Sequence, residues 1–311
     1  MLVLDRDLQR GCRSVAPTKA AGAPQICVVF ATRGRPSLLG QAVAAIERQT
    51  CRPASIIVSC PSPDDAAPVL GRPDVTVLCE ATGLAAQRNV ALRQVARDTD
   101  IVVFFDDDFL PRADWLECVA ETFARHPDIG AVTGDVIADG IKGPGLSVAE
   151  AEALIAGAPA EARHWMVDSY VPYGCNMAFR WSVISDHRFD ERLVLYGWLE
   201  DRDFGAALER NGARIVKISS AVGVHMGVKS GRVSGRKLGY SQVVNPLYLY
   251  RKGNMPLGAV ADHLFRNIAS NLGRAFRPEP YVDRRGRLYG NLRAMGDILR
   301  GSIEPERAGN L

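Results

Sequence analysis

The sequence predicts an α/β protein, with a mostly parallel central sheet flanked by helices and then a helical, basic C-terminal extension. Short runs of β-branched and aromatic residues, each long enough for a buried strand, recur in the first third of the 311-residue chain. Segments with helical apolar spacing lie between them, and strands that alternate with helices form parallel βαβ units. Two further amphipathic patterns close the chain.

Four strands and two helices are expected before residue 106. The strands are expected at 25–32, 55–60, 75–79 and 101–105, and the helices at 37–49 (with Ser37 as N-cap) and 83–97. The first strand is followed by no GxGxxG and no GxxxxGK[ST] pattern. This argues against a dinucleotide-binding Rossmann domain and against a P-loop NTPase.

After Asp108 the pattern becomes less regular. Helices are expected at 114–124 and 200–210, and strands at 131–137, 214–218 and 222–225. The Gly- and Ala-rich stretch 138–170 gives only weak indications of structure.

The C-terminal region is basic, since residues 229–307 hold 15 Lys and Arg against 6 Asp and Glu in a chain of net charge +3. We expect region 226–311 to begin with a mobile basic loop, 227–239, and to continue as two amphipathic helices. Their apolar faces are Val260, Leu264, Ile268 and Leu272, and then Leu288, Leu292, Met295 and Leu299. Such helices either pack on the rest of the protein or lie on an anionic membrane.

The seven cysteines include no CxxC pair, which fits reduced thiols in a cytosolic protein better than a zinc site or a disulfide framework. Residues 1–23 are expected to form a loose arm, because they begin with charges and lack the apolar core of a signal peptide. No run approaches the ~20 apolar residues of a membrane span. We expect a cytoplasmic protein, with peripheral contact at the inner face of the cell membrane as a further possibility.

Three adjacent acids, Asp106–Asp107–Asp108, follow the apolar run 101–105 directly. Ligands of open α/β sheets bind outside the carboxyl ends of the strands. The acids therefore indicate either a metal-assisted site for a phosphorylated ligand or a solvated acidic turn.

Four motifs in order carry a resemblance to a known family. They are Val28–Pro36, Gly83–Asn89, Phe105–Asp108 and Leu199–Phe204, with His225 after them. Together they resemble an inverting family 2 glycosyltransferase of the GT-A fold, a Rossmann-like arrangement. The resemblance implies a GT-A domain over 24–225, divided into a nucleotide-binding half (24–108) and an acceptor- and sugar-binding half (109–225).

The resemblance implies a set of nucleotide-sugar-binding residues. They are Thr32, Arg33, Arg35, Arg88, Asn89, Asp106, Asp107, Gly174 and Asn176. Arg88 would neutralise a phosphate, or would pair with a surface acid. The family often has an acid for the base after the second strand, but Ser59–Cys60–Pro61 stands here. The base therefore stays open, with a UDP-sugar favoured.

The resemblance also implies a divalent metal, Mn²⁺ or Mg²⁺. Asp108 would bind it directly, Asp106 would hold the ribose or the metal's water, and Asp107 has the least claim to a role. His225 resembles the family's additional metal ligand, and imidazole suits Mn²⁺ better than Mg²⁺. The alternative for His225 is a structural residue at the end of a strand.

Glu200 and Asp201 would supply the catalytic base. Inverting transfer needs one carboxylate to take the proton of the acceptor hydroxyl, and we choose Asp201, with Glu200 as the alternate. An acid pair at a helix start also complements the helix dipole. Trp198 would stack on the acceptor sugar, or would belong to the core.

The expected function is metal-dependent transfer of a hexose-type sugar from a nucleoside-diphosphate sugar to a glycan or lipid-linked glycan, in polysaccharide or cell-envelope biosynthesis. An anionic membrane surface is a further expected partner, and nucleic acid is not. Two alternatives remain at this stage: a sugar-1-phosphate nucleotidyltransferase, and a non-catalytic glycan- or nucleotide-binding relative.

Overall fold

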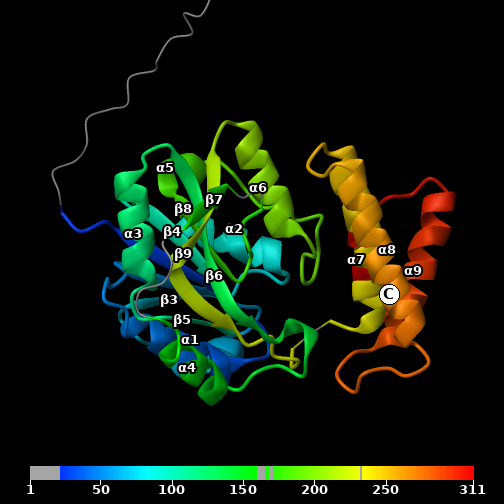
Figure 1. Ribbon diagram of the computed structural model, residues 1–311, viewed down its shortest axis with the longest axis horizontal. Helices are drawn as coiled ribbons and strands as arrows, with labels where there is room; N and C mark the ends of the chain where they lie inside the picture. Colours follow the sequence, from blue (N-terminus) through cyan, green and yellow to red (C-terminus); the bar gives the residue numbers. More distant parts are fainter. Residues whose placement is uncertain (1–21, 160–164, 169–170, 232) are drawn as a thin grey trace, which may run out of the picture.

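One mixed sheet with helices on both faces forms the centre of the computed structural model, which describes residues 22–159, 165–168, 171–231 and 233–311 (Figure 1). The strand order is β3-β2-β1-β4-β8-β6-β9-β5, and β7 pairs with β9. The first half is parallel and consists of β3 (Val75–Leu78), β2 (Ser55–Ser59), β1 (Ile26–Ala31) and β4 (Ile101–Phe105). The predicted α/β class is confirmed.

The second half of the sheet mixes parallel and antiparallel pairs. Its strands are β8 (Asn176–Arg180), β6 (Ile129–Asp139), β9 (Arg214–His225), β5 (Phe109–Pro111) and β7 (Met166–Asp168). Strand β8 is antiparallel to β4 and β6, whereas β6 and β9 are parallel. Because β8 runs against β4, the residues just before β8 meet the residues just after β4.

The side chains of β1 alternate between two cores. Val28 and Phe30 belong to the core that includes residues of α1 (Pro36–Glu47) and α3 (Trp115–Arg125). Cys27 and Val29 belong to the core that includes residues of α2 (Leu84–Gln94) and α6 (Glu200–Arg210). Both faces of the strand are therefore covered, as the continuous apolar runs predict.

Several local predictions were wrong or incomplete. Ser37 is not the N-cap of α1, because the helix begins at Pro36 and its N-cap is Arg35, which makes no side-chain cap bond. The stretch 138–170 contains α4 (Val148–Ala156), whose capping box joins Ser147 and Glu150. The remaining short helices are η1 (Pro63–Val69), η2 (Gly140–Lys142), α5 (Trp181–Ile184) and η3 (Pro305–Asn310). The predicted N-terminal arm, 1–23, lies outside the described residues except for its last two.

Three long helices, not two, follow β9 in the described C-terminal region (Figure 1). They are α7 (Gly235–Arg251), α8 (Leu257–Arg274) and α9 (Arg284–Leu299). The expected loop therefore ends by Ser234. The glycines that suggested a loop instead allow close helix packing, because a Cβ at Gly239 would lie 2.1 Å from the Arg287 carbonyl oxygen. None of the helices in the described ranges is long and apolar enough to cross a membrane.

Candidate active site

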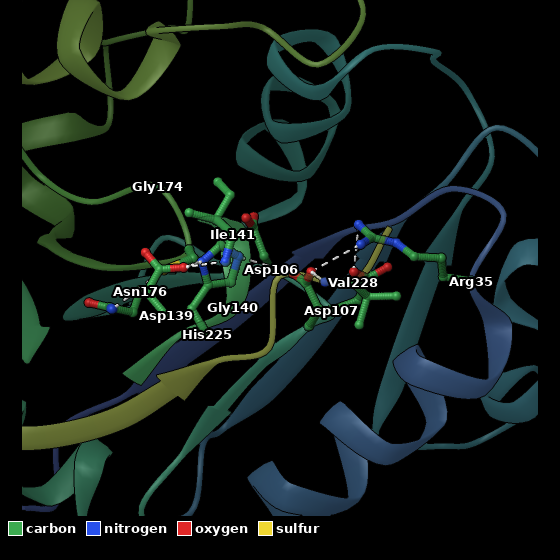
Figure 2. Close-up of polar contacts among 12 residues, drawn as sticks. Arg35, Asp106, Asp107, Asp139, Gly140, Ile141, Gly174, Asn176, His225 and Val228 are labelled. Carbon is green, nitrogen blue, oxygen red and sulfur yellow. Dashed lines mark hydrogen bonds and ion pairs between the residues drawn. The ribbon is translucent and has the colours of Figure 1, made fainter. Parts of the chain in front are cut away.

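The three acids after β4 lie at the carboxyl edge of the sheet (Figure 2). Asp107 and Asp108 are 0% and 4% exposed, and Asp106 is partly exposed. The Asp106 backbone N–H donates to the Cys175 carbonyl at 3.2 Å, so the turn before β8 closes over the end of β4. Buried carboxylates are unfavourable unless they are paired, and each of the three has a basic partner.

Asp106, Asp108 and His225 form a group that can hold a metal ion. One ligand atom from each residue lies within 4.8 Å of those from the other two. The pairing of β5 with β9 sets Phe109 opposite His225, which brings the imidazole to the acids that precede Phe109. Carboxylate oxygens and an imidazole nitrogen fit the divalent cation that the motif implies.

Asp139, at the end of β6, orients His225 and was missed by the sequence analysis. Its Oδ1 lies 3.0 Å from His225 Nδ1 (Figure 2). Its Oδ2 accepts a 2.7 Å hydrogen bond from the Tyr173 hydroxyl. The other ring nitrogen, Nε2, faces Asp108 Oδ1 at 3.6 Å. A carboxylate that holds one nitrogen of a metal-binding histidine directs the other toward the metal. No motif marked Asp139, because it falls in the irregular stretch 138–170.

The electrostatics of this group depend on His225. Burial alone would lower the pKa of His225, but its hydrogen bonds and charge interactions with Asp108 and Asp139 outweigh burial and raise the pKa to about 10. Burial would raise the pKa of Asp108, but His225 and Arg35 lower it to about 2. The metal-free group is thus an imidazolium between carboxylates, and a cation that binds here must displace the imidazolium proton.

Asp107, the acid with the least expected role, connects two loops. Its carboxylate accepts a 2.6 Å hydrogen bond from the Thr32 hydroxyl and pairs with Arg35 at 2.7 Å. Arg35 also reaches Asp108 at 3.3 Å. The structure therefore brings Thr32 and Arg35 to the acids, whereas Arg33 is exposed.

Arg88 is almost fully buried, at 1% exposure, next to the carboxylates of Asp106 and Glu200. It forms ion pairs with Glu200 and, at 3.2 Å, with Asp106, and donates to the Gly174 carbonyl at 2.9 Å. The Arg88 guanidinium therefore links the start of α6 to the metal-binding group. Its predicted contact with a phosphate stays a prediction, and the surface alternative is wrong.

Asn89 points away from this cluster. Its amide donates to the Phe189 carbonyl at 2.9 Å and to Glu191 at 2.8 Å, and its oxygen accepts from the Phe189 N–H at 2.8 Å. These bonds hold the segment that precedes Glu200 and Asp201, a structural role that the motif did not suggest.

Glu200 and Asp201 begin α6, immediately after Leu199, which has a left-handed φ of 72°. Such a conformation is strained for a residue with a branched side chain and is typical of functional turns. Glu200 is 4% exposed and engaged by Arg88, while Asp201 is partly exposed. Burial raises the pKa of Asp201, opposed by the backbone N–H groups of Gly174 and Arg202. A carboxylate with a raised pKa at a partly open position can accept a proton.

Gly174 lies between the two parts of the site. Its N–H donates to Asp201 Oδ2 at 3.0 Å, and its carbonyl accepts from Arg88. A Cβ here would lie 3.1 Å from the same Asp201 oxygen, so the close approach favours glycine.

Two other predicted site residues make contacts that join elements of the fold. Asn176 is 0% exposed and accepts a 2.8 Å bond from the Gly134 N–H, so it joins β8 to β6. Trp198 is partly buried, and its carbonyl accepts from Asn245 of α7 at 2.8 Å. Tyr196, which the motifs did not mark, is 44% exposed. It is the aromatic residue of this turn that is open to solvent.

The fold and the site define a GT-A glycosyltransferase, and residues 24–236 match the family described as "Glycosyltransferase like family 2". The chain belongs to this family. The predicted resemblance is confirmed, and so is the assignment as a glycosyltransferase. No curated protein matches the sequence.

Solved structures with the same fold include two that hold nucleotide sugars. The mannosyltransferase PcManGT from Pyrobaculum calidifontis, in complex with GDP-Man and Mn²⁺, has 17% identity and a TM-score of 0.56, with 89% of this chain and 88% of that chain covered. TarS 1–349 from S. aureus, in complex with UDP-GlcNAc, has 16% identity and a TM-score of 0.56, with 91% and 82% covered.

Proposed function

We propose that this glycosyltransferase is inverting and metal-dependent, and that it moves a hexose-type sugar from a nucleoside-diphosphate sugar to a hydroxyl of a glycan or lipid-linked glycan. The donor is a UDP-sugar by preference. The reaction serves polysaccharide or cell-envelope assembly at the inner face of the cell membrane. The observation that carries the proposal is the group Asp106, Asp108 and His225, joined through Arg88 to the acids of α6.

Asp201 is the base in this proposal. It takes the proton of the acceptor hydroxyl while that oxygen attacks the anomeric carbon from the face opposite the leaving diphosphate. The N–H groups of Gly174 and Arg202 hold its two oxygens in place. Glu200 is the alternate, but its ion pair with Arg88 leaves it less free.

The residues around the acids position the donor. Asp106, Asp108 and His225 would hold a divalent cation, which offsets the negative charge on the departing nucleoside diphosphate. Arg35, held by Asp107, lies beside this group and contributes further positive charge. The molecules bound in the two similar structures, GDP-Man with Mn²⁺ and UDP-GlcNAc, support a nucleotide sugar as the donor and a metal as its partner.

The alternatives differ in their products. A sugar-1-phosphate nucleotidyltransferase would use the metal-binding acids but would leave Asp201 without a role. A non-catalytic relative would bind donor without turnover. The assay incubates the protein with Mn²⁺ and a panel of UDP-, GDP- and dTDP-sugars, with candidate acceptors, and separates release of nucleoside diphosphate from release of pyrophosphate. Acceptor-dependent nucleoside diphosphate is the expected product, and either other result refutes the proposal.

Asp201→Asn tests the assignment of the base. We expect transfer to be abolished while donor binding, measured by calorimetry, is retained. The control is Glu209→Gln, which removes an exposed carboxylate near the other end of the same helix. Full activity of Asp201→Asn would show that another group takes the proton.

A further inference from the structure

The C-terminal helices expose an unusual amount of apolar surface. Of the thirteen large hydrophobic side chains that are exposed among the described residues, eight lie between Tyr250 and Leu299. The most exposed are Leu257 (59%), Phe265 (74%) and Phe276 (81%) on or just after α8, and Leu292 (60%) and Leu299 (88%) on α9. We call these five residues the apolar face. Large apolar patches on soluble proteins mark interaction sites.

The apolar face is not the side on which these helices pack against each other, because other residues make the contacts between the helices. Asn271 of α8 and Asn291 of α9 are fully buried and joined by a 3.0 Å hydrogen bond. Gly290 of α9 packs against the backbone of α7, where a Cβ would lie 2.2 Å from the Arg236 carbonyl oxygen. These small and polar residues, together with an apolar cluster that includes Val244 and Ala294, occupy the inward sides of the helices and leave Leu292 and Leu299 on the outside.

Exposed basic side chains occur in the same part of the chain as the apolar face. Arg277, Arg285 and Arg293 are exposed and form no ion pair with any carboxylate in the described residues. Acids of α8 and of the segment between the two helices have basic partners. Asp262 pairs with Arg266 at 2.6 Å, and Glu279 pairs with Arg274 and Arg284. Exposed apolar side chains and exposed arginines without carboxylate partners therefore occur together on α8, on α9 and on the segment between them.

The combination of exposed apolar side chains and unpaired arginines indicates what kind of partner this surface binds. A second copy of the chain on a two-fold axis would place the same patch, with its unpaired arginines, against itself, and like charges would oppose the contact. An anionic lipid surface accepts both features, because the apolar side chains enter the boundary of the acyl chains and the arginines meet the headgroups.

We propose that the outer surface of α8 and α9 binds anionic membranes, with both helices at the interface rather than across the bilayer. This deepens the proposed function, since a lipid-linked acceptor would then be met at the same surface. The binding itself needs neither metal nor donor, so it can fail or succeed independently of the transfer reaction.

The test is co-sedimentation of the full chain with vesicles of phosphatidylcholine alone or mixed with phosphatidylglycerol. We expect binding to the mixed vesicles that weakens with salt. Phe265→Ser with Phe276→Ser should weaken it more than about tenfold. Arg285→Gln with Arg293→Gln should weaken it about thirty-fold and remove the preference for phosphatidylglycerol.

The matched control is Leu154→Ser, which removes an exposed apolar side chain from α4, outside this surface. It should bind as the unchanged protein does. All changed side chains are exposed, and thermal unfolding checks that each variant is folded. No sedimentation with mixed vesicles, or equal binding by every variant, overturns the proposal. A dimer in light scattering that Phe265→Ser with Phe276→Ser abolishes, without vesicle binding, would assign the face to a second copy instead.

Discussion

Replacing Arg88 by methionine tests whether the buried ion pair with Glu200 holds the two parts of the site together. The side chains of Arg88 and Glu200 are 2% and 5% exposed. Removing one member of such a pair leaves an uncompensated buried charge, which costs about 3–5 kcal/mol. Asp106, 3.2 Å from Arg88, would lose the same partner. We therefore expect Arg88→Met to lower the free energy of unfolding by about 3–5 kcal/mol at a pH above the pKa of Glu200, which burial raises to about 8 even beside Arg88.

The assay is urea unfolding, followed by tryptophan fluorescence, of Arg88→Met, Glu200→Gln and the double variant. The double variant should be more stable than the sum of the single effects predicts, by about 0.5–3 kcal/mol, because the two residues contact each other. The loss in Arg88→Met should shrink as the pH falls through the raised pKa of Glu200, which rises further without Arg88, since protonation removes the unpaired charge.

The control is Arg125→Met, which breaks an exposed pair with Glu121 in which the side chains are 70% and 51% exposed. Exposed pairs contribute about 0–1 kcal/mol. The reasoning is refuted if Arg88→Met costs no more than Arg125→Met, or if the effects of Arg88→Met and Glu200→Gln are simply additive.

Three further predictions follow from the site and from the helix packing. Asp139→Asn should weaken Mn²⁺ binding by about 10–100-fold in calorimetry, while Asp135→Asn, on the same strand, should not; equal affinities would remove the role of Asp139. In the presence of EDTA, the free energy of unfolding that His225 contributes should be fully present below pH 6.5 and be lost as the pH rises through its folded-state pKa of about 10. If the difference in free energy of unfolding between the unchanged protein and His225→Asn is constant over this pH range, the prediction is wrong. Gly239→Ala should lower the free energy of unfolding, measured in urea, by about 1–3 kcal/mol, because the added methyl group overlaps α9. Gly273→Ala has open space around it and should stabilise α8 by up to about 1 kcal/mol, so a change of the same sign in both variants would contradict the prediction.

The residues that the sequence identified best are those whose signal is local. The run 101–105 followed by three acids predicted a buried strand and a ligand-binding edge, because both depend on residues adjacent in the chain. The predicted group of Asp106, Asp108 and His225 is brought together in the structure, although the metal and its role stay predictions.

Contacts between residues far apart in the chain could not be predicted from a single sequence. Asp139 and His225 are 86 residues apart, and Arg88 and Glu200 are 112 residues apart. Nothing in the local pattern shows that the imidazole has a carboxylate behind it, or that Arg88 lies below the acids. The glycines of α7 are a similar case, since their composition indicates a loop until the α9 backbone is placed against them.

The three acids at the end of β4 show where the two kinds of information divide. The sequence by itself determined the family, the strand that carries the acids and the kind of chemistry they allow, because strand burial and carboxylate chemistry are local properties. Only the tertiary structure decided what each acid contacts: Asp108 faces His225, Asp106 faces Arg88, and Asp107 is bound by Thr32 and Arg35. Side-chain pairing in a buried site depends on which segments the sheet brings to one edge, and that is a property of the whole fold.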